Sequence, residues 1–437
     1  MKLYSRGKKE SAPLLLYLPQ KQTGFLCPPD RVGGTTPALK NKQKPSRATS
    51  VKPSANASHQ NRNKYTQRKF KGREVPEGLD RLEEMDIPEL EAVRKAAPAP
   101  ERVVVPSPAA ERVIEQVPVQ DPVQDPVQVP VQEATPTSMP ANRIYAALQG
   151  ENRIMVMDGA TEAVVDAIEL PSGSSARSIA VNAAANRIYA IHSNKHQISV
   201  IDGSSREVIA VVPVSPFPSL AAVNEKTNRV YITSSLMNAV DVLNGATNQL
   251  IETVGVGNIP AGIAVNKVTN RIYVANGSPD HDLSVIDGVT NTRLFPDIPL
   301  QHEPGVAGVH TEANLIYVPN FKSDSVTVIY GATNTPVTTI TDGIGSNPYC
   351  AAVHPGTNLV YVTNSGSDNV SVIDASSHKV IHSVPVGHCP KTVAVNTTTN
   401  RIYVLVMGGI AVLDGESNEL IGTIKLPGNP SDIALSE

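Results

Sequence analysis

A four-residue phrase, Asn-(Arg/Leu)-(Ile/Val)-Tyr, occurs seven times within about the last 300 residues of this 437-residue chain. The repeats begin at intervals of 42 or 44 residues, with their asparagines at Asn142, Asn186, Asn228, Asn270, Asn314, Asn358 and Asn400. A period near 40 residues is typical of a blade built from four β-strands. The spacing therefore predicts seven copies of one small sheet arranged around a common axis.

Residues 257–300 contain one complete repeat. Four short segments rich in Val, Ile and Ala lie at 260–266, 270–276, 283–287 and 292–298, and polar turns containing Asn, Asp or Gly separate them. These turn residues accept the positive φ that tight hairpins require. Short β-branched segments at this spacing predict strands and exclude a helical solenoid.

The two ends of the repeat region complement each other. The strand that precedes the phrase in the other copies is missing before Asn142, while residues 429–436 supply an additional copy at the C-terminal end. We expect the last strand to complete the blade that the first strands begin, which leaves no sheet edge open around the ring. The predicted fold is an all-β, seven-bladed β-propeller over residues 139–437.

Charge divides the chain into three parts. Residues 1–75 have a net charge of +14, residues 76–138 one of −8, and residues 139–437 one of −9. The polar, basic first part is predicted to be a disordered tail. The acidic second part repeats proline every few residues, which favours an extended spacer, and it contains a candidate short helix after Ile87. No apolar run approaches the length of a membrane-spanning helix.

The tyrosine of the phrase and the three residues that follow it give a family resemblance. Residues 361–364 read Tyr-Val-Thr-Asn, and residues 273–276 and 317–320 are close to that sequence. With the flanking Ile-Ala-Val-Asn and Val-Ser-Val-Ile-Asp-Gly strands, residues 139–437 resemble the YVTN-type β-propeller repeat family, which includes surface-layer-like and YncE-like proteins. The resemblance implies an exported, seven-bladed binding propeller without shared catalytic residues. The N-terminus has no clear signal peptide, so the compartment stays open between periplasm, cell surface and secretion.

Most residues that suggest chemistry belong to the repeat. The seven phrase tyrosines are predicted to pack between blades, and the aspartates that follow the third strand are predicted to accept backbone N–H groups in turns. His310 and His354 occupy a slot that holds asparagine in other copies. We interpret this slot as a polar turn position; the alternative is a pair of metal ligands. We therefore predict no catalytic residue, no metal site and no cofactor.

The loops at one end of the ring vary between copies. These are the connections between blades and those between second and third strands, and loops that vary on a rigid scaffold are typical binding surfaces. The predicted ligand-binding residues of this variable loop face are Phe217, His302, Phe321, Tyr349 and His388. Lys195, His196 and His281 lie on the same face. The three cysteines form no disulfide framework, although a disulfide between Cys350 and Cys389 is conceivable in an oxidising compartment.

These observations favour a non-catalytic binding or scaffold propeller, monomeric, that recognises a protein, a glycan or a small ligand on the variable loop face. One alternative is a propeller enzyme of the lactonase or metal-dependent lyase type with its site at the channel mouth, where His302, His310, His354 and His388 are the candidates. Another is nonspecific binding of nucleic acid or another polyanion by the basic tail.

Overall fold

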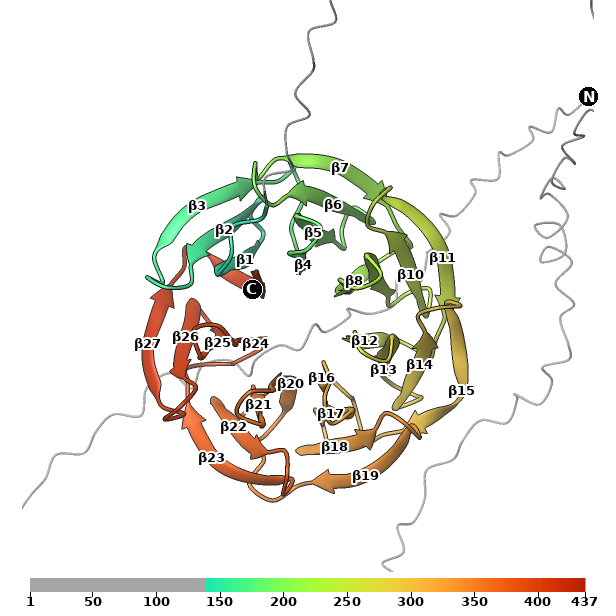
Figure 1. The fold of residues 1–437 in the computed structure, drawn as a ribbon, viewed down its shortest axis with the longest axis vertical. Helices are drawn as coiled ribbons and strands as arrows, with labels where there is room; N and C mark the ends of the chain where they lie inside the picture. The colour runs from blue at the N-terminus through green and yellow to red at the C-terminus, as the bar shows by residue number, and fades with distance from the viewer. Residues whose placement is uncertain (1–137, 437) are drawn as a thin grey trace, which may run out of the picture. The chain divides into compact units, whose positions relative to one another are not determined.

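The computed structural model describes residues 138–436. Within them, 28 β-strands form seven four-stranded antiparallel sheets, and the sheets are arranged as the blades of a ring (Figure 1). This is the predicted seven-bladed β-propeller. None of these residues forms a helix with the length and apolarity needed to cross a membrane. The predicted tail at 1–75 lies outside the described residues, as does the spacer at 76–138 except for Ser138.

Blade 1 contains β28, β1, β2 and β3, and each later blade contains the next four strands in chain order. The innermost strands, one from each blade, are β28 (Asn429–Ser436), β4 (Ser178–Asn182), β8 (Pro218–Asn224), β12 (Pro260–Asn266), β16 (Gly308–His310), β20 (Pro348–His354) and β24 (Val393–Asn396). The second strands, which begin within the repeated phrase, are β1 (Arg143–Gln149), β5 (Arg187–His192), β9 (Arg229–Ser234), β13 (Arg271–Asn276), β17 (Leu315–Asn320), β21 (Leu359–Asn364) and β25 (Arg401–Val406).

The third strands are β2 (Arg153–Asp158), β6 (Gln197–Asp202), β10 (Ala239–Asn244), β14 (Asp282–Asp287), β18 (Ser325–Tyr330), β22 (Asn369–Asp374) and β26 (Gly409–Asp414). The outermost strands are β3 (Val164–Glu169), β7 (Val208–Pro213), β11 (Gln249–Gly255), β15 (Thr292–Pro299), β19 (Thr335–Ile340), β23 (Lys379–Pro385) and β27 (Leu420–Lys425). Second and third strands are buried along nearly their whole length because a neighbouring blade covers each face, which explains their continuous apolar runs.

The C-terminal strand closes the ring. β28 pairs antiparallel with β1 from Arg143 opposite Ser436 to Gln149 opposite Asn429, and so completes blade 1. Figure 1 shows the last strand of the chain beside the first. The expectation from the missing N-terminal strand is confirmed.

Seven apolar clusters fill the spaces between neighbouring blades, one cluster at each interface. The tyrosine of each repeated phrase packs into the interface with the next blade, and none of the seven is more than 1% exposed. Burying a large side chain in this way contributes about 1.5–3 kcal/mol. The phrase tyrosines are therefore packing residues, as the sequence predicts.

The asparagine of the phrase has two structural tasks. In all seven copies it adopts the left-handed conformation, with φ between 49° and 57°. In six copies its side-chain oxygen also accepts a hydrogen bond of 2.7–3.0 Å from the last residue of the innermost strand in the preceding blade. The donors of this series are Asn182, Asn224, Asn266, His310, His354 and Asn396. The last position of the innermost strand, which the sequence predicts to be a turn position, therefore also links one blade to the next.

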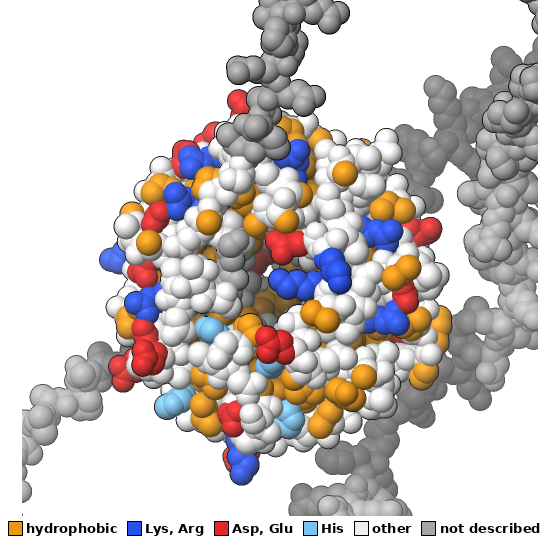
Figure 2. Space-filling model, viewed as in Figure 1, with side chains coloured by type: hydrophobic (Ala, Val, Ile, Leu, Met, Phe, Trp, Pro, Cys, Tyr) orange, Lys and Arg blue, Asp and Glu red, His pale blue; other side chains and the backbone are white. Residues whose placement is uncertain are grey.

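The phrase arginines and the turn aspartates pair within blades. Arg143, for example, pairs with Asp158 at 2.5 Å, and Arg187 pairs with Asp202 at 2.9 Å. The aspartates also accept backbone N–H groups in their turns, as predicted; hydrogen bonds from the Ser417 backbone hold the pKa of Asp414 below its ordinary value. Figure 2 shows one face of the ring, hollowed at its centre, with acidic and basic side chains interspersed around the opening.

Candidate functional site

A cavity of about 1080 Å³ opens at one end of the central channel. Its wall includes residues from the innermost strands and from the connections between blades, so every blade contributes to it. The contributing loops belong to the variable loop face of the sequence prediction. A preformed, concave space on a rigid scaffold is the usual form of a ligand site.

One position of the innermost strands gives this wall its chemistry. It lies directly after the proline that begins β8, β12 and β20; a proline also precedes it in blades 1, 5 and 7, and Ala176 precedes it in blade 2. The pairing register shifts at this position in β12, β20 and β28, which marks a β-bulge. Bulges redirect a side chain and are frequent next to functional sites. We name it the bulge position; in blades 1 to 7 it holds Ser431, Arg177, Ser219, Ala261, Gly305, Tyr349 and Lys391.

The residue at the bulge position differs in size and charge from blade to blade. Blades 3, 4 and 5 have only the small residues Ser219, Ala261 and Gly305 there. A Cβ atom on Gly305 would lie 2.2 Å from the Tyr349 carbonyl oxygen, so only glycine fits between these two strands. The large or charged residues Tyr349, Lys391 and Arg177 occur on blades 6, 7 and 2, and the small Ser431 of blade 1 lies between the last two; all four line the cavity. The wall is therefore lined mainly by apolar residues at the inner strands of blades 3 to 5, and it carries its two cations at blades 7 and 2.

Two cations face this cavity. Arg177 lies directly before β4 and is exposed, whereas Lys391 lies before β24 and is half-buried. Neither side chain has an ion pair or a side-chain hydrogen bond with any residue in the described range 138–436. Burial lowers the pKa of Lys391, and the nearby charge of Arg177 lowers it further.

Tyr349 completes the polar side. Burial raises the pKa of its phenol to about 12, so the hydroxyl keeps its proton over the physiological range. The positive charge of Arg177 opposes this rise in the pKa. Phe321 contacts Tyr349 edge to face, with a ring-centre distance of 6.5 Å.

A buried carboxylate lies beside the cations without pairing with them. Asp432 of β28 is only 7% exposed. Its oxygens accept hydrogen bonds from the hydroxyls of Ser178 and Thr392 and from the backbone of Ile179 and Ile433, at 2.7–3.1 Å. Burial raises the pKa of Asp432 despite these bonds. The carboxylate is fully engaged in joining blade 1 to blades 2 and 7.

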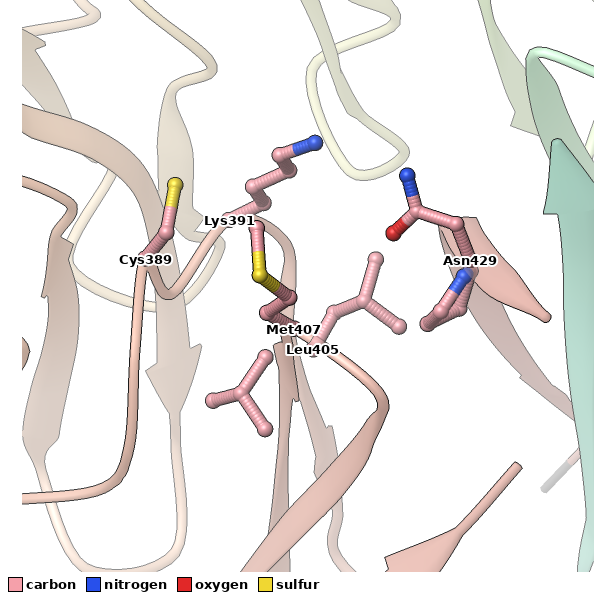
Figure 3. Close-up of a pocket in the computed structure, with 7 residues that line it drawn as sticks. Cys389, Lys391, Leu405, Met407 and Asn429 are labelled. Carbon is pink, nitrogen blue, oxygen red and sulfur yellow. The ribbon is translucent and has the colours of Figure 1, made fainter. Parts of the chain in front are cut away.

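A smaller pocket of about 30 Å³ adjoins the polar side. Figure 3 shows Cys389, Lys391 and Asn429 extending towards the same side of this pocket, with Leu405 and Met407 behind them. Lys391 and Asn429 come from neighbouring blades, 7 and 1. The interface between these blades therefore presents one cationic group and one amide to the cavity.

The conceivable disulfide between Cys350 and Cys389 is not formed, because Cys350 has a free thiol. Cys350 is 3% exposed, and burial raises its pKa to about 12. A thiol with so high a pKa is a poor nucleophile and a poor metal ligand at neutral pH. Cys350 is therefore a packing residue of the inner strand.

The five predicted binding residues are divided by the structure. Phe321 and Tyr349 belong to the cavity wall, whereas Phe217, His302 and His388 lie in the connections between blades and are not part of that wall. These three have neighbours in the loops. Phe217 packs on His196, His302 packs on His281, and His388 approaches Asp368 to 3.3 Å.

One hydrogen bond recurs in the variable loop face although the residue type that accepts it changes from blade to blade. In five places, a side chain from a second-to-third loop accepts a hydrogen bond of 2.8–3.3 Å from a backbone N–H in the next blade connection. The acceptors are His196, Asn238, His281, Asp324 and Asp368. Donor and acceptor residues all adopt positive φ. His196 and His281 thus have a structural role, which the sequence does not reveal because His, Asn and Asp share acceptor capacity but not identity.

His310 and His354 have a similar explanation. In each ring, Nε2 donates a hydrogen bond to the side-chain oxygen of a phrase asparagine, and Nδ1 accepts a 3.3 Å hydrogen bond from a backbone N–H. Both ring nitrogens are occupied, which favours the turn interpretation over the metal alternative. No group of three or more His, Cys, Asp or Glu side chains within residues 138–436 is arranged to hold a metal ion.

Arg177, Lys391 and Asp432 were not among the predicted site residues. A signal for them exists in the sequence: aligning the innermost strands shows that Arg177, Tyr349 and Lys391 depart from the small residues found at the bulge position in other blades. Asp432 departs likewise, since Gly262 occupies its place in blade 4. Only the structure shows that these strand positions face the channel.

Comparison with solved structures agrees with the fold. The hydrazine synthase of Kuenenia stuttgartiensis is similar over 60% of this chain and 90% of its own, with 17% identity and a TM-score of 0.54. A functionally unknown protein from Desulfotomaculum acetoxidans DSM 771 is similar over 68% of this chain and 99% of its own, with 14% identity and a TM-score of 0.60. No family model and no curated protein sequence matches the chain. At such identities the likeness shows the fold alone, which is that of the β-propeller proteins.

Proposed function

We propose that this chain is a binding propeller whose ligand occupies the cavity at the channel mouth. The observation that carries the proposal is the unequal bulge position: Arg177, Tyr349 and Lys391 gather on one side of a cavity of about 1080 Å³. Ring packing alone does not require this inequality, because small residues satisfy the same position in blades 3, 4 and 5. Polar groups that converge on a mainly preformed cavity are typical of ligand recognition.

The repeat sequence supports a finer proposal. Its phrase and the residues after it resemble YVTN-type propellers, and we propose that the chain serves, like that family, as a binding protein of the cell envelope or the extracellular space. The test is localisation of the untagged native protein by cell fractionation with periplasmic and cytoplasmic markers. Recovery only with cytoplasmic markers would contradict the envelope assignment without affecting the binding proposal.

The binding proposal is tested with the full chain in a thermal-shift screen of small glycans, peptides and organic anions. For any compound that raises the melting temperature, we expect Tyr349→Ala and Phe321→Ala to weaken binding at least tenfold, because both side chains belong to the cavity wall. Phe217→Ala and His388→Ala are the matched controls, since neither lines the cavity. Equal losses in all four variants, or losses only in the controls, would reject the cavity as the site.

The enzyme alternative, a lactonase or metal-dependent lyase, needs a cation held near the channel. Elemental analysis of the purified full chain tests it directly. Stoichiometric metal that is lost in a His302→Ala and His388→Ala double variant would favour the enzyme. The basic tail remains a separate prediction, tested by the salt dependence of polyanion binding to the full chain and to a chain lacking residues 1–75.

A further inference from the structure

We propose that the ligand of the channel-mouth cavity is a small molecule bearing an oxyanion, a carboxylate or a phosphate group, and that Arg177 and Lys391 bind this group together. The inference rests on the proposed function and specifies its ligand class. It concerns the polar side of the cavity, where the bulge position carries Tyr349, Lys391, Ser431 and Arg177 on four consecutive blades.

The first argument is that the two cations are unpaired. Elsewhere in residues 138–436, four phrase arginines pair with the turn aspartate of their own blade. Arg177 and Lys391 have no such partner in that range, although both line a cavity. Two like charges held within electrostatic range of each other repel, and an anion placed between them removes that repulsion.

The second argument is that the neighbouring acid forms no ion pair with them within residues 138–436. Asp432 is the carboxylate that lines the cavity within residues 138–436, and four donors from its own and two adjacent blades already occupy its oxygens. Its position is fixed by blades 1, 2 and 7 rather than by the cations. The wall facing the cavity therefore keeps an excess of positive charge.

The third argument is the supply of neutral donors around the cations. The wall contains the amides of Asn347 and Asn429 and the hydroxyl of Ser175, whereas the Ser431 hydroxyl already donates to the Ala176 carbonyl over 2.8 Å. A guanidinium fork, an ammonium group and several neutral donors form the combination that binds carboxylate or phosphate oxygens. The apolar residues Leu220, Ile263 and Val306 line the cavity as well and suit the uncharged body of such a ligand.

The lowered pKa of Lys391 agrees with this geometry. Burial and the charge of Arg177 both disfavour its protonated form. A bound anion supplies the missing countercharge, so ligand binding is expected to raise the pKa of Lys391. This shift is a readout that a purely structural lysine does not give.

The test is isothermal titration of the full chain with citrate, glucuronate and inorganic phosphate, with glucose as the neutral probe. We expect at least one oxyanion to bind, glucose to bind at least tenfold more weakly, and Arg177→Ala and Lys391→Ala each to weaken oxyanion binding at least tenfold. Lys379→Ala is the matched control, since it removes one exposed positive charge from β23. Comparison of the three anions separates a carboxylate ligand from a phosphate ligand.

A second measurement follows the Lys391 side chain by NMR with ¹³C-labelled lysine, assigned with Lys391→Arg. The expected result is an upward shift of the Lys391 pKa on saturation with the best-binding anion. Oxyanion binding that is unchanged in Arg177→Ala and Lys391→Ala would overturn the inference, as would the absence of binding by all three anions. If the neutral compounds of the screen then bind and lose affinity in Tyr349→Ala, the inference fails while the proposed function stands.

Discussion

The hydroxyl of Ser178 donates a 2.7 Å hydrogen bond to Oδ2 of Asp432, across 254 positions of the chain. The other carboxylate oxygen, Oδ1, accepts a 2.9 Å hydrogen bond from the hydroxyl of Thr392. Ser178 belongs to blade 2, Thr392 precedes the innermost strand of blade 7, and Asp432 lies in the C-terminal strand that completes blade 1. One buried side chain therefore joins three blades at the place where the ring closes.

Replacing Asp432 by alanine is expected to destabilise the propeller by roughly 3 kcal/mol or more, because buried hydroxyl and backbone donors lose their acceptor together. Asp432→Asn keeps one acceptor oxygen and is expected to cost less. Urea unfolding followed by circular dichroism measures both. Asp342→Ala, at an exposed loop carboxylate, is the control, and an Asp432→Ala curve that superimposes on it would contradict the role of Asp432 in closure.

Removal of residues 429–437 is expected to lower the melting temperature by at least roughly 10 °C, or to cause aggregation, since stability losses of several kcal/mol shift the melting temperature by this much. The truncation removes all of β28 and exposes the paired edge of β1. Differential scanning calorimetry and light scattering report the two outcomes. Deletion of Glu437 alone is the matched control, and equal melting of the two chains would argue against closure by β28.

Stability should fall between pH 6.5 and pH 4 through His192, which is fully buried and whose pKa burial lowers from 6.5 to about 4. Because the folded pKa lies below the unfolded one, the contribution is complete above pH 6.5 and is lost as acid protonates the unfolded chain first. The expected loss is roughly 3 kcal/mol. Denaturant unfolding at a series of pH values measures it.

The matched variants for this pH effect are His192→Asn and His382→Asn. Asparagine is native at the equivalent end of the second strand in three other blades, at Asn276, Asn320 and Asn364, whereas His382 is exposed on an outer strand. Only His192→Asn is expected to flatten the pH dependence over this window. Parallel curves for the wild type and both variants would show that another group is responsible.

Two phrase tyrosines provide a comparison of buried hydroxyls. The Tyr361 hydroxyl donates to Oδ1 of Asn418 over 2.8 Å, while the buried hydroxyl of Tyr273 has no hydrogen-bond partner among residues 138–436. Tyr361→Phe is therefore expected to cost about 1 kcal/mol, and Tyr273→Phe to be neutral or stabilising. Equilibrium unfolding of both variants decides the matter, and an equal cost at the two positions would be inconsistent with this assignment.

The link from His354 to Asn400 predicts which substitutions blade 6 tolerates. His354→Asn is expected to cost less than about 1 kcal/mol, because asparagine makes the same bond to the next blade at Asn396 and Asn266. His354→Ala should cost about 1–3 kcal/mol, since a buried acceptor loses its donor. Thermal melts with parallel metal analysis test both points. A metal bound to the wild type and lost in His354→Asn would support the metal alternative instead.

The strand pattern could be predicted closely from the sequence. The segment predicted at 283–287 corresponds to β14 (Asp282–Asp287), and the one at 260–266 to β12 (Pro260–Asn266). The closing strand was equally visible at the ends of the repeat. These features follow from local rules, since apolar periodicity and turn residues act within a few positions of the chain.

The candidate site was predicted only in part. Phe321 and Tyr349 line the cavity, whereas His302 and His388 do not. Histidine and aromatic residues in the loops depart visibly from the repeat, and they were therefore predicted to bind the ligand. Arg177 and Lys391 lie just before the inner strands β4 and β24, and they differ from their counterparts in other blades mainly in size and charge.

The sequence by itself determined the number of blades, the strands of each blade and the closure of the ring, because a repeat of fixed length must stack upon itself to bury its apolar faces. The tertiary structure alone decided which exceptions to the repeat converge. Arg177 and Lys391 are more than 200 positions apart, yet the ring sets their strands two blades from each other around one cavity. Convergence of this kind depends on ring geometry, which brings the starts of the innermost strands together around one axis, and this is not encoded in the local pattern.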